Sequence, residues 1–279
     1  MAYQIVMDSC GDMTEEMKRD ERITLVPLRL HIGGKEYIDD GTLERREVLS
    51  AIEHSEDVPR SSCPSPTEYQ EKMTSGYERT YLITLSEHLS GSYNSACLAY
   101  RQMPKDRQKT VFVINSHSAS AGETLLAQLI QDWEENEIAF DEICKMLIQR
   151  VEMIKTRFVL EDLTMLERNG RLNGLKAKIA GVLHICPVLA GTPQGTICQT
   201  GQARGMKRGI VKLFHQILED SKEQQWERMV ISHCCNEEMA IELKTKIRNV
   251  FPERAVRIAA TGGVSSLYAG RGGIIVSYV

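Results

Sequence analysis

The first half of the chain alternates short apolar runs with longer segments in which apolar residues recur at helical spacing. Short apolar runs favour buried strands, whereas recurrence every three or four residues favours helices. Strands and helices that alternate in this way are typical of a layered parallel sheet. We expect strands at Gln4–Met7, Ile23–Ile32, Lys35–Ile38, Thr80–Leu85 and Thr110–Ile114, and helices at Leu43–Glu53, Gly91–Gln102, Ser120–Glu134 and Asp141–Ile154.

One helix start in this half has a specific local signature. Ser65 is followed by Pro66 and, three positions on, by Glu68. Serine at the cap, proline at the first helical position and glutamate reaching back form a capping box. A helix is therefore predicted to begin at Pro66.

The second half of the chain is less regular. A helical turn at Leu163–Arg168 ends at the dipeptide Asn169-Gly170, and a turn at Gly191–Gly195 separates two short apolar runs. Glycine and asparagine at such positions are typical of turns. We expect strands at Arg157–Leu160, His184–Leu189, Thr196–Gln199, Met229–His233, Ala255–Ala259 and Ile274–Tyr278, and helices at Ala203–Glu219 and Glu237–Val250.

These elements predict an α/β protein of two domains. A chain of 279 residues is long for one compact core and suits two domains of ordinary size. The change in pattern places the boundary near Lys155. We expect an N-terminal layered parallel-sheet domain over residues 1–155 and a C-terminal α/β domain over residues 156–279.

Composition narrows the possible partners. Apolar residues make up 42% of the chain and charged residues 26%, with a formal net charge of −4. No basic run is present, so the sequence gives no indication of nucleic-acid binding. No run of about 18 apolar residues is available to span a bilayer, so no integral membrane segment is expected.

The cysteines and the first residues point to the cytoplasm. The eight cysteines include no Cys-x-x-Cys pair, and Cys234 and Cys235 are adjacent, which is poor geometry for a bridge. Several others lie in apolar stretches, where a thiol acts as a small hydrophobe. The opening apolar run reaches an acid after a few residues, which is typical of a buried strand and not of a signal peptide. We expect reduced thiols in a cytoplasmic protein.

Three clusters of hydroxyl side chains lie just past expected strands or at expected helix starts. They occupy Ser61–Ser65, Ser86–Tyr93 and Asn115–Ser120. Ligands of open parallel sheets bind beyond the carboxyl ends of the strands, where helix starts present unpaired N–H groups. Ser90-Gly91 at a helix start suits an anion. Helix capping alone also explains serines at such positions, and the residues leave these two interpretations about equally supported.

Signals for catalysis and for metal binding are weak. The seven histidines show no paired ligand spacing, so no metal site is expected. Ser90 lies near His88, but Gly-x-Ser-x-Gly and the Gly-rich nucleotide-binding motifs are absent. Gly270–Gly273 could cradle a phosphate or form a tight turn. Two arginines around Asn169-Gly170, Arg168 and Arg171, could meet an anion or lie solvated beside a helix end.

Seven segments taken in order resemble the DegV family of bacterial fatty-acid-binding proteins. The segment Leu89–Ala96 is similar to the family's Leu-Ser-Gly-Thr-Tyr-x-Ser-Ala, and Ser61–Ser65 to its Thr-Ser-x-Pro-Ser. The resemblance extends over nearly the whole chain. The matching segments are Val6–Asp12, Val26–Leu28, Tyr37–Gly41, Ser61–Ser65, Leu89–Ala96, Asn115–Gly122 and Leu166–Arg171.

The resemblance implies two α/β domains with a long-chain fatty acid buried between them. Hydroxyls at Ser61 and Ser90, with backbone N–H groups near Ser62 and Gly91, would hold the carboxylate. The family also implies presentation of the lipid to a separate fatty-acid kinase that makes an acyl-phosphate. Such a protein would be a carrier and not an enzyme, without a cofactor. Three arginines are candidates for orientation or partner docking, namely Arg171, Arg204 and Arg271.

Three positions depart from the family pattern. Tyr268 stands where the family has a histidine that helps bind the carboxylate, Arg271 replaces a proline, and Asn115 replaces an aspartate. A tyrosine keeps a hydrogen-bond donor. The departures leave two alternatives beside the carrier. One is a protein that binds another small carboxylate or has a regulatory role on the same fold. The other is an enzyme with a Ser90 or Ser92 nucleophile, or with phosphoryl transfer at Gly270–Gly273.

Overall fold

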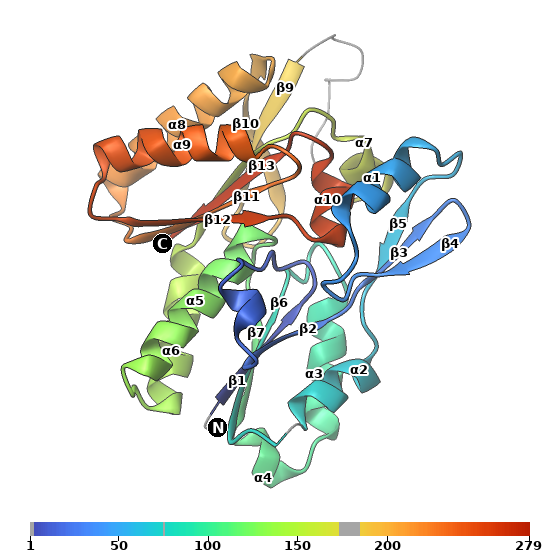
Figure 1. Cartoon of the computed structure of the whole chain (residues 1–279). Coiled ribbons are helices and arrows are strands. Elements are labelled where there is room, and N and C mark those ends of the chain that lie inside the picture. The colour runs from blue at the N-terminus through green and yellow to red at the C-terminus, as the bar shows by residue number, and fades with distance from the viewer. Residues whose placement is uncertain (1–2, 75, 173–184) are drawn as a thin grey trace.

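The computed structural model describes residues 3–74, 76–172 and 185–279. Within these ranges the strands form a four-stranded sheet, a three-stranded sheet and a six-stranded sheet (Figure 1). The parallel sheet and the separate mixed sheet confirm the predicted α/β class. No helix within these ranges is long and apolar enough to cross a membrane.

The four-stranded sheet is parallel throughout, with the order β2-β1-β6-β7. Alternate side chains of its strands face opposite helical layers. Ile5 and Met7 pack with α5 and α6, whereas Val6 packs with α2 and α3. The elements are β1 (Tyr3–Asp8), β2 (Ile23–Val26), α2 (Pro66–Met73), β6 (Arg79–Thr84), α3 (Ser92–Gln102), α4 (Lys105–Gln108), β7 (Val111–Asn115), α5 (Ala121–Glu135) and α6 (Phe140–Met153).

The predicted strand Ile23–Ile32 is wrong as one element, because it divides between two sheets. Pro27 lacks an N–H group, and the amide of Leu28 donates to Ser9 Oγ at 2.9 Å instead of to a strand. The chain then enters a small antiparallel sheet of β3 (Arg29–Ile32), β4 (Lys35–Ile38) and β5 (Arg60–Ser62). The polar strand β5, which carries Ser61, has no apolar signal and was not predicted. Helix α1 (Arg45–Glu53) lies between β4 and β5 in the chain.

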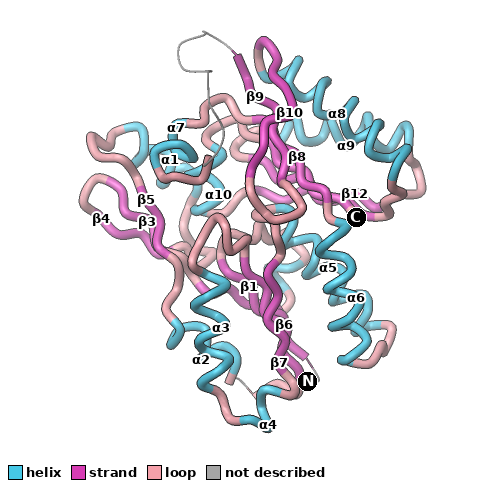
Figure 2. The backbone as a smooth tube through the Cα atoms, turned by 180° about the vertical axis from the view of Figure 1, so that it is seen from behind, coloured by secondary structure: helices cyan, strands magenta, loops and turns pink. Residues whose placement is uncertain are grey.

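The six-stranded sheet is mixed, with the order β10-β9-β8-β13-β11-β12. Helices α8 and α9 cover one face of it, as Figures 1 and 2 show, while α5 packs against β11 and β13 on the other. All six strands follow Ile154, and the domain boundary near Lys155 stays a prediction. The elements are η1 (Met17–Arg19) in the first half, and β8 (Lys155–Val159), α7 (Thr164–Arg168), β9 (Ile185–Gly191), β10 (Ile197–Arg204), α8 (Met206–Glu223), β11 (Arg228–His233), α9 (Glu237–Val250), β12 (Ala255–Ala260), α10 (Gly263–Ala269) and β13 (Ile274–Tyr278).

Two further expectations need correction in this half. The helix predicted from Ala203 begins at Met206, since Ala203 and Arg204 belong to β10 and Gly205 turns the chain with a φ of 79°. The short helix α10 was not predicted. Of the strand expected at His184–Leu189, His184 lies outside the described residues.

Helix α10 is held by carboxylates from the first half of the chain. Gly262 N donates to Asp12 Oδ1 at 2.8 Å, and the amides of Gly263 and Val264 donate to Asp39 at 2.9 and 2.8 Å. Asp12 and Asp39 are 1% and 2% exposed, so these hydrogen bonds are shielded from water. Figure 1 shows α10 beside α1, and the two helices are in contact.

Gly263 is required by this close approach. A Cβ atom at position 263 would lie 2.7 Å from Asp39 Oδ1 and 3.0 Å from Leu43 Cδ2. We predict that Gly263→Ala lowers the free energy of unfolding by about 1–3 kcal/mol, because the added methyl group forces α10 away from Asp39. Chemical denaturation measures the loss. Gly76→Ala is the matched control, since its Cβ would meet no atom within 4 Å, and an equal loss in both variants would contradict the explanation.

Candidate functional site

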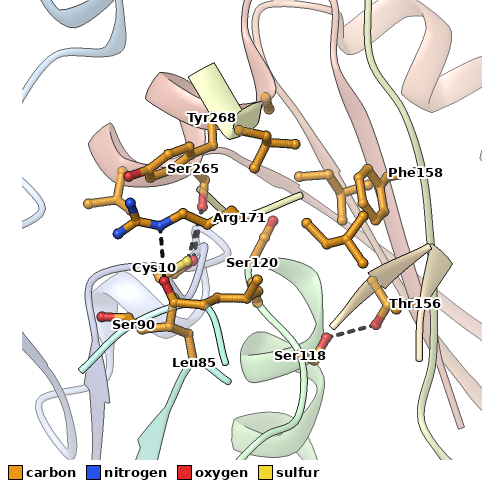
Figure 3. A pocket seen from close by; sticks show the side chains of 18 of the residues that line it. Cys10, Leu85, Ser90, Ser118, Ser120, Thr156, Phe158, Arg171, Ser265 and Tyr268 are labelled. Carbon is orange, nitrogen blue, oxygen red and sulfur yellow. Dashed lines mark hydrogen bonds between the residues drawn. The ribbon is translucent and has the colours of Figure 1, made fainter. Parts of the chain in front are cut away.

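A cavity lies between the carboxyl ends of the parallel strands, α10 and the six-stranded sheet (Figure 3). About 840 Å³ of space within its outline is not filled by protein atoms, and part of that space is open solvent. Residues from both halves of the chain form its walls, for example Leu85 and Ser90 from the first half and Phe158 and Tyr268 from the second.

Four predicted site residues meet at one end of the cavity. Ser61, Ser90, Arg171 and Tyr268 all line it, and Figure 3 shows Ser90, Arg171 and Tyr268 on the side opposite Phe158 and Thr156. Ser61 Oγ and Tyr268 Oη lie 2.8 Å apart and share a hydrogen bond. We refer to this end, defined by these four side chains, as the polar end.

Arg171 brings a fixed positive charge to the polar end. Its Nε donates to the carbonyl of Leu89 at 3.1 Å, and a second donor binds the carbonyl of Asn169. The guanidinium lies over the ring of Tyr268, 5.5 Å from the ring centroid, where a cation and an aromatic face attract each other. Burial raises the pKa of Tyr268, although Ser61 and Arg171 lower it, so the phenol remains a neutral donor at pH 7.

The middle of the cavity is apolar. Phe158 lies on β8 and Leu160 directly follows it, Leu166 lies on α7, and Ile197 and Ile275 come from β10 and β13. Strands of the six-stranded sheet therefore supply most of this surface.

Hydroxyl groups at the opposite end of the cavity bond to one another. Ser118 Oγ lies 2.7 Å from Thr156 Oγ1, which lies 2.9 Å from Ser277 Oγ. Ser86 Oγ donates to the carbonyl of Gly195 at 2.7 Å, which fixes the β9–β10 turn against the first half of the chain. A Cβ atom at Gly195 would lie 2.3 Å from Ser86 Oγ, so only glycine fits. These hydroxyls need no ligand to satisfy them.

Four other predicted residues lie outside the cavity. Ser62 is exposed and its Oγ lies 3.0 Å from His31 Nε2. Gly91 is exposed at the start of α3. Arg204 is exposed at the end of β10, and Arg271 lies 3.4 Å from Glu53 on α1. The structure therefore separates the predicted residues into a group at the polar end and a surface group.

Sequence reasoning missed two contributors to the polar end. Cys10 lies in the loop after β1 and Ser265 on α10; both line the cavity, and Ser265 Oγ donates to the carbonyl of Cys10 at 2.9 Å. The signal for α10 was present in the sequence. Gly262-Gly263 and two serines follow a strand directly, as in the three clusters that were recognised.

The geometry does not support a serine nucleophile or a phosphate-binding loop. Ser90 Oγ pairs with Ser92 Oγ at 3.1 Å, and His88 is exposed. Gly270 and Gly272 have positive φ, and Gly273 N donates to the carbonyl of Gly270. Residues 270–273 therefore form a tight turn, which is one of the two interpretations offered for this segment. Over the described part of the chain, no three His, Cys, Asp or Glu side chains are grouped to hold a metal ion.

The ionisation of the Asp39 carboxyl group can be used to test the buried contacts that position α10. Burial raises its pKa to about 6, against the lowering effect of the amides of Val264 and Gly263. A carboxyl group with a raised pKa contributes stability that is complete below pH 4 and is lost as the pH rises through 6. We expect the wild-type advantage over Asp39→Asn to shrink by about 3 kcal/mol between pH 3.5 and pH 7. Denaturation curves at several pH values measure this, and an advantage that grows with pH would contradict it.

Comparisons with known proteins give matches over nearly the whole chain. The family model described as "Uncharacterised protein, DegV family" matches residues 2–279. A DegV-family protein from Ruminococcus gnavus, whose crystal structure contains vaccenic acid, is 40% identical, with a TM-score of 0.93 and 99% of each chain covered. The fatty acid kinase B3 protein of Streptococcus pneumoniae, loaded with linoleic acid, is 29% identical, with a TM-score of 0.91, and the match covers 100% of this chain and 99% of that one.

A curated relative gives the same result at the level of sequence. A DegV domain-containing protein of Streptococcus pneumoniae is 29% identical over 281 residues, which cover 100% of this chain and 99% of the relative. The match therefore spans both halves of the fold, including every wall of the cavity described above. This protein belongs to the DegV family.

Proposed function

We propose that this protein binds one long-chain fatty acid by its carboxylate and presents it to a separate fatty-acid kinase for acyl-phosphate formation. The observation that carries the proposal is a cavity with apolar walls and a cluster of donors at one end. The solved relatives that contain vaccenic and linoleic acid support it. The acyl chain would lie between a domain of residues 1–155 and a domain of residues 156–279.

The apolar walls supply the affinity. Burial of hydrocarbon contributes roughly 0.8 kcal/mol per methylene group. A chain of about 16 carbons therefore gains about 12 kcal/mol before the costs of association and ordering. That gain is enough for tight binding, and Phe158, Leu160 and Ile275 are the side chains that would contact the chain. The acid is the ligand, and the protein needs no cofactor.

The polar end would prevent an unpaired buried charge. A carboxylate moved out of water costs several kcal/mol unless donors replace its hydration. Ser61, Ser90 and Tyr268 carry hydroxyl donors there, and Arg171 adds a positive charge nearby. Tyr268 thus takes over a donor role at the position where the family has histidine. Among the described residues, Ser90 Oγ bonds to Ser92 and to no histidine or carboxylate directly, which favours a carrier over an enzyme.

Two further features belong to the proposal. All eight cysteines are unpaired, which favours a cytoplasmic carrier because thiols persist in reducing compartments. Arg204 and Arg271 are exposed outside the cavity and are available to contact the kinase.

Native mass spectrometry of the purified protein tests the proposed ligand. We expect one fatty acid per chain, identified after organic extraction. Ser90→Ala should weaken binding by about tenfold, because a buried carboxylate loses one hydrogen bond. Ser62→Ala is the control, since that side chain faces away from the cavity, and it should bind normally. An empty protein that does not take up added palmitate or oleate, but binds a short polar acid, would overturn the proposal.

A kinase assay tests presentation. The loaded protein is mixed with a bacterial fatty-acid kinase and ATP, and acyl-phosphate is trapped with hydroxylamine. We expect Arg204→Ala and Arg271→Ala to lower turnover severalfold, because exposed cations steer and fix a protein partner. Fatty-acid affinity should stay unchanged in both variants. Product formed at the wild-type rate by both would exclude these arginines from docking.

A further inference from the structure

Two carboxyl groups are buried beneath the polar end of the cavity. Asp8 ends β1, Glu123 lies in the first turn of α5, and both are 0% exposed. Asp8 accepts hydrogen bonds from the amides of Cys10 at 3.1 Å and Leu85 at 2.9 Å. Glu123 lies beside Asp8 and can share a hydrogen bond with it when one of the two holds a proton, whereas no amide or hydroxyl group of the described residues donates to its carboxyl oxygens. A buried carboxyl group with so few partners is costly and calls for an explanation.

The pair holds at least one proton at neutral pH. The titratable groups that face it are Cys10, Asp12 and Tyr69, and none of these is a cation. Two carboxyl groups side by side in an apolar interior resist joint ionisation. Burial raises the pKa of Glu123 well above its usual range and that of Asp8 to about 7.

A chain of hydroxyls joins this pair to the cavity. Ser92 is fully buried at the start of α3, and its side chain interacts with the carboxyl of Asp8. Ser92 Oγ lies 3.1 Å from Ser90 Oγ. Ser90 lines the cavity. Ser92 and Ser90 therefore lie between Asp8 and the position proposed for the fatty-acid carboxylate.

The direction of this chain depends on the proton. A hydroxyl group donates one hydrogen bond. When Asp8 is protonated it donates to Ser92, Ser92 donates to Ser90, and the proton of Ser90 is left for the ligand. Ser90 Oγ also accepts from Ser92 N at 3.3 Å, so both of its lone pairs are then used. When Asp8 is ionised the chain reverses, and Ser90 presents a lone pair that repels a carboxylate.

We propose that the Asp8–Glu123 pair couples fatty-acid binding to the uptake of one proton, which Ser92 and Ser90 transmit as a change in hydrogen-bond direction. This inference rests on the proposed function. The ligand enters as the carboxylate anion, the proton comes from solvent and resides on Asp8, and no covalent bond of the lipid changes. The complex thus gains one negative charge and one proton together.

Calorimetry of laurate binding between pH 6 and pH 9 tests the coupling, in two buffers of different ionisation enthalpy. Laurate is already ionised over this range, so any pH dependence belongs to the protein. We expect constant affinity below pH 7 and a fall of about tenfold between pH 7 and pH 8.5, since one unit of pKa shift is a factor of ten. The buffer comparison should show roughly half a proton or more taken up at pH 7.5.

Single substitutions identify the residues through which proton uptake affects fatty-acid binding. Asp8→Asn carries a permanent donor toward Ser92, so its affinity should be independent of pH. Ser92→Ala breaks the chain and should abolish proton uptake with Asp8 still present. Ser95→Ala is the matched control on the same helix, because Ser95 Oγ donates to the carbonyl of Pro64, and it should keep the wild-type pH dependence. Circular dichroism checks that each variant is folded. If Asp8→Asn does not fold, the result for Ser92→Ala alone tests the coupling.

The outcomes separate the two proposals. Wild-type affinity that is flat from pH 6 to pH 9, with no proton uptake, would overturn the coupling and leave the carrier function standing. Equal loss of coupling in Ser92→Ala and Ser95→Ala would overturn the role of the hydroxyl chain. Absence of laurate binding at every pH would instead overturn the carrier function.

Discussion

The hydrogen bonds from three consecutive amides at the start of α10 to Asp12 and Asp39 are the contacts on which the site depends. They join a helix of the second half of the chain to loops of the first half. One turn further along, Tyr268 reaches Ser61 on the small sheet. The polar end therefore exists only while these buried carboxylates hold α10 in place. Gly263 permits the approach because it has no side chain.

Much of the fold was predictable from apolar periodicity and turn residues. The parallel strands, the capping box at Ser65 and most helices follow from local sequence. Periodicity could not divide Ile23–Ile32, because both parts are apolar and the division depends on where Pro27 falls relative to two sheets. It could not identify β5, whose polar residues are a strand only because β3 lies beside them.

The residue types of the site could be predicted from the sequence, but the positions of their side chains could not. Ser61, Ser90, Arg171 and Tyr268 were proposed from the resemblance to the DegV family, and the structure brings them together. Ser62 and Gly91 were proposed with them and lie outside the cavity. Adjacent residues of a strand point to opposite faces, so the side chains of Ser61 and Ser62 do not both face the cavity, and the role expected for the backbone N–H groups near Ser62 and Gly91 stays a prediction. Asp8 lies in the segment Val6–Asp12 that resembles the family, but its pairing with Glu123 carries no local signal, since their proximity exists only after α5 packs on β1.

Helix α5 has a consequence for how the molecule behaves as a whole. It packs on the four-stranded sheet with one side and on β11 and β13 with the other. Nearly every residue from Ala121 to Ile130 is buried. This helix belongs to the first half of the chain, and separation of the halves would expose to water the face that packs with Val230 and Ala259. Any movement of one sheet relative to the other would therefore cost the burial of that apolar face.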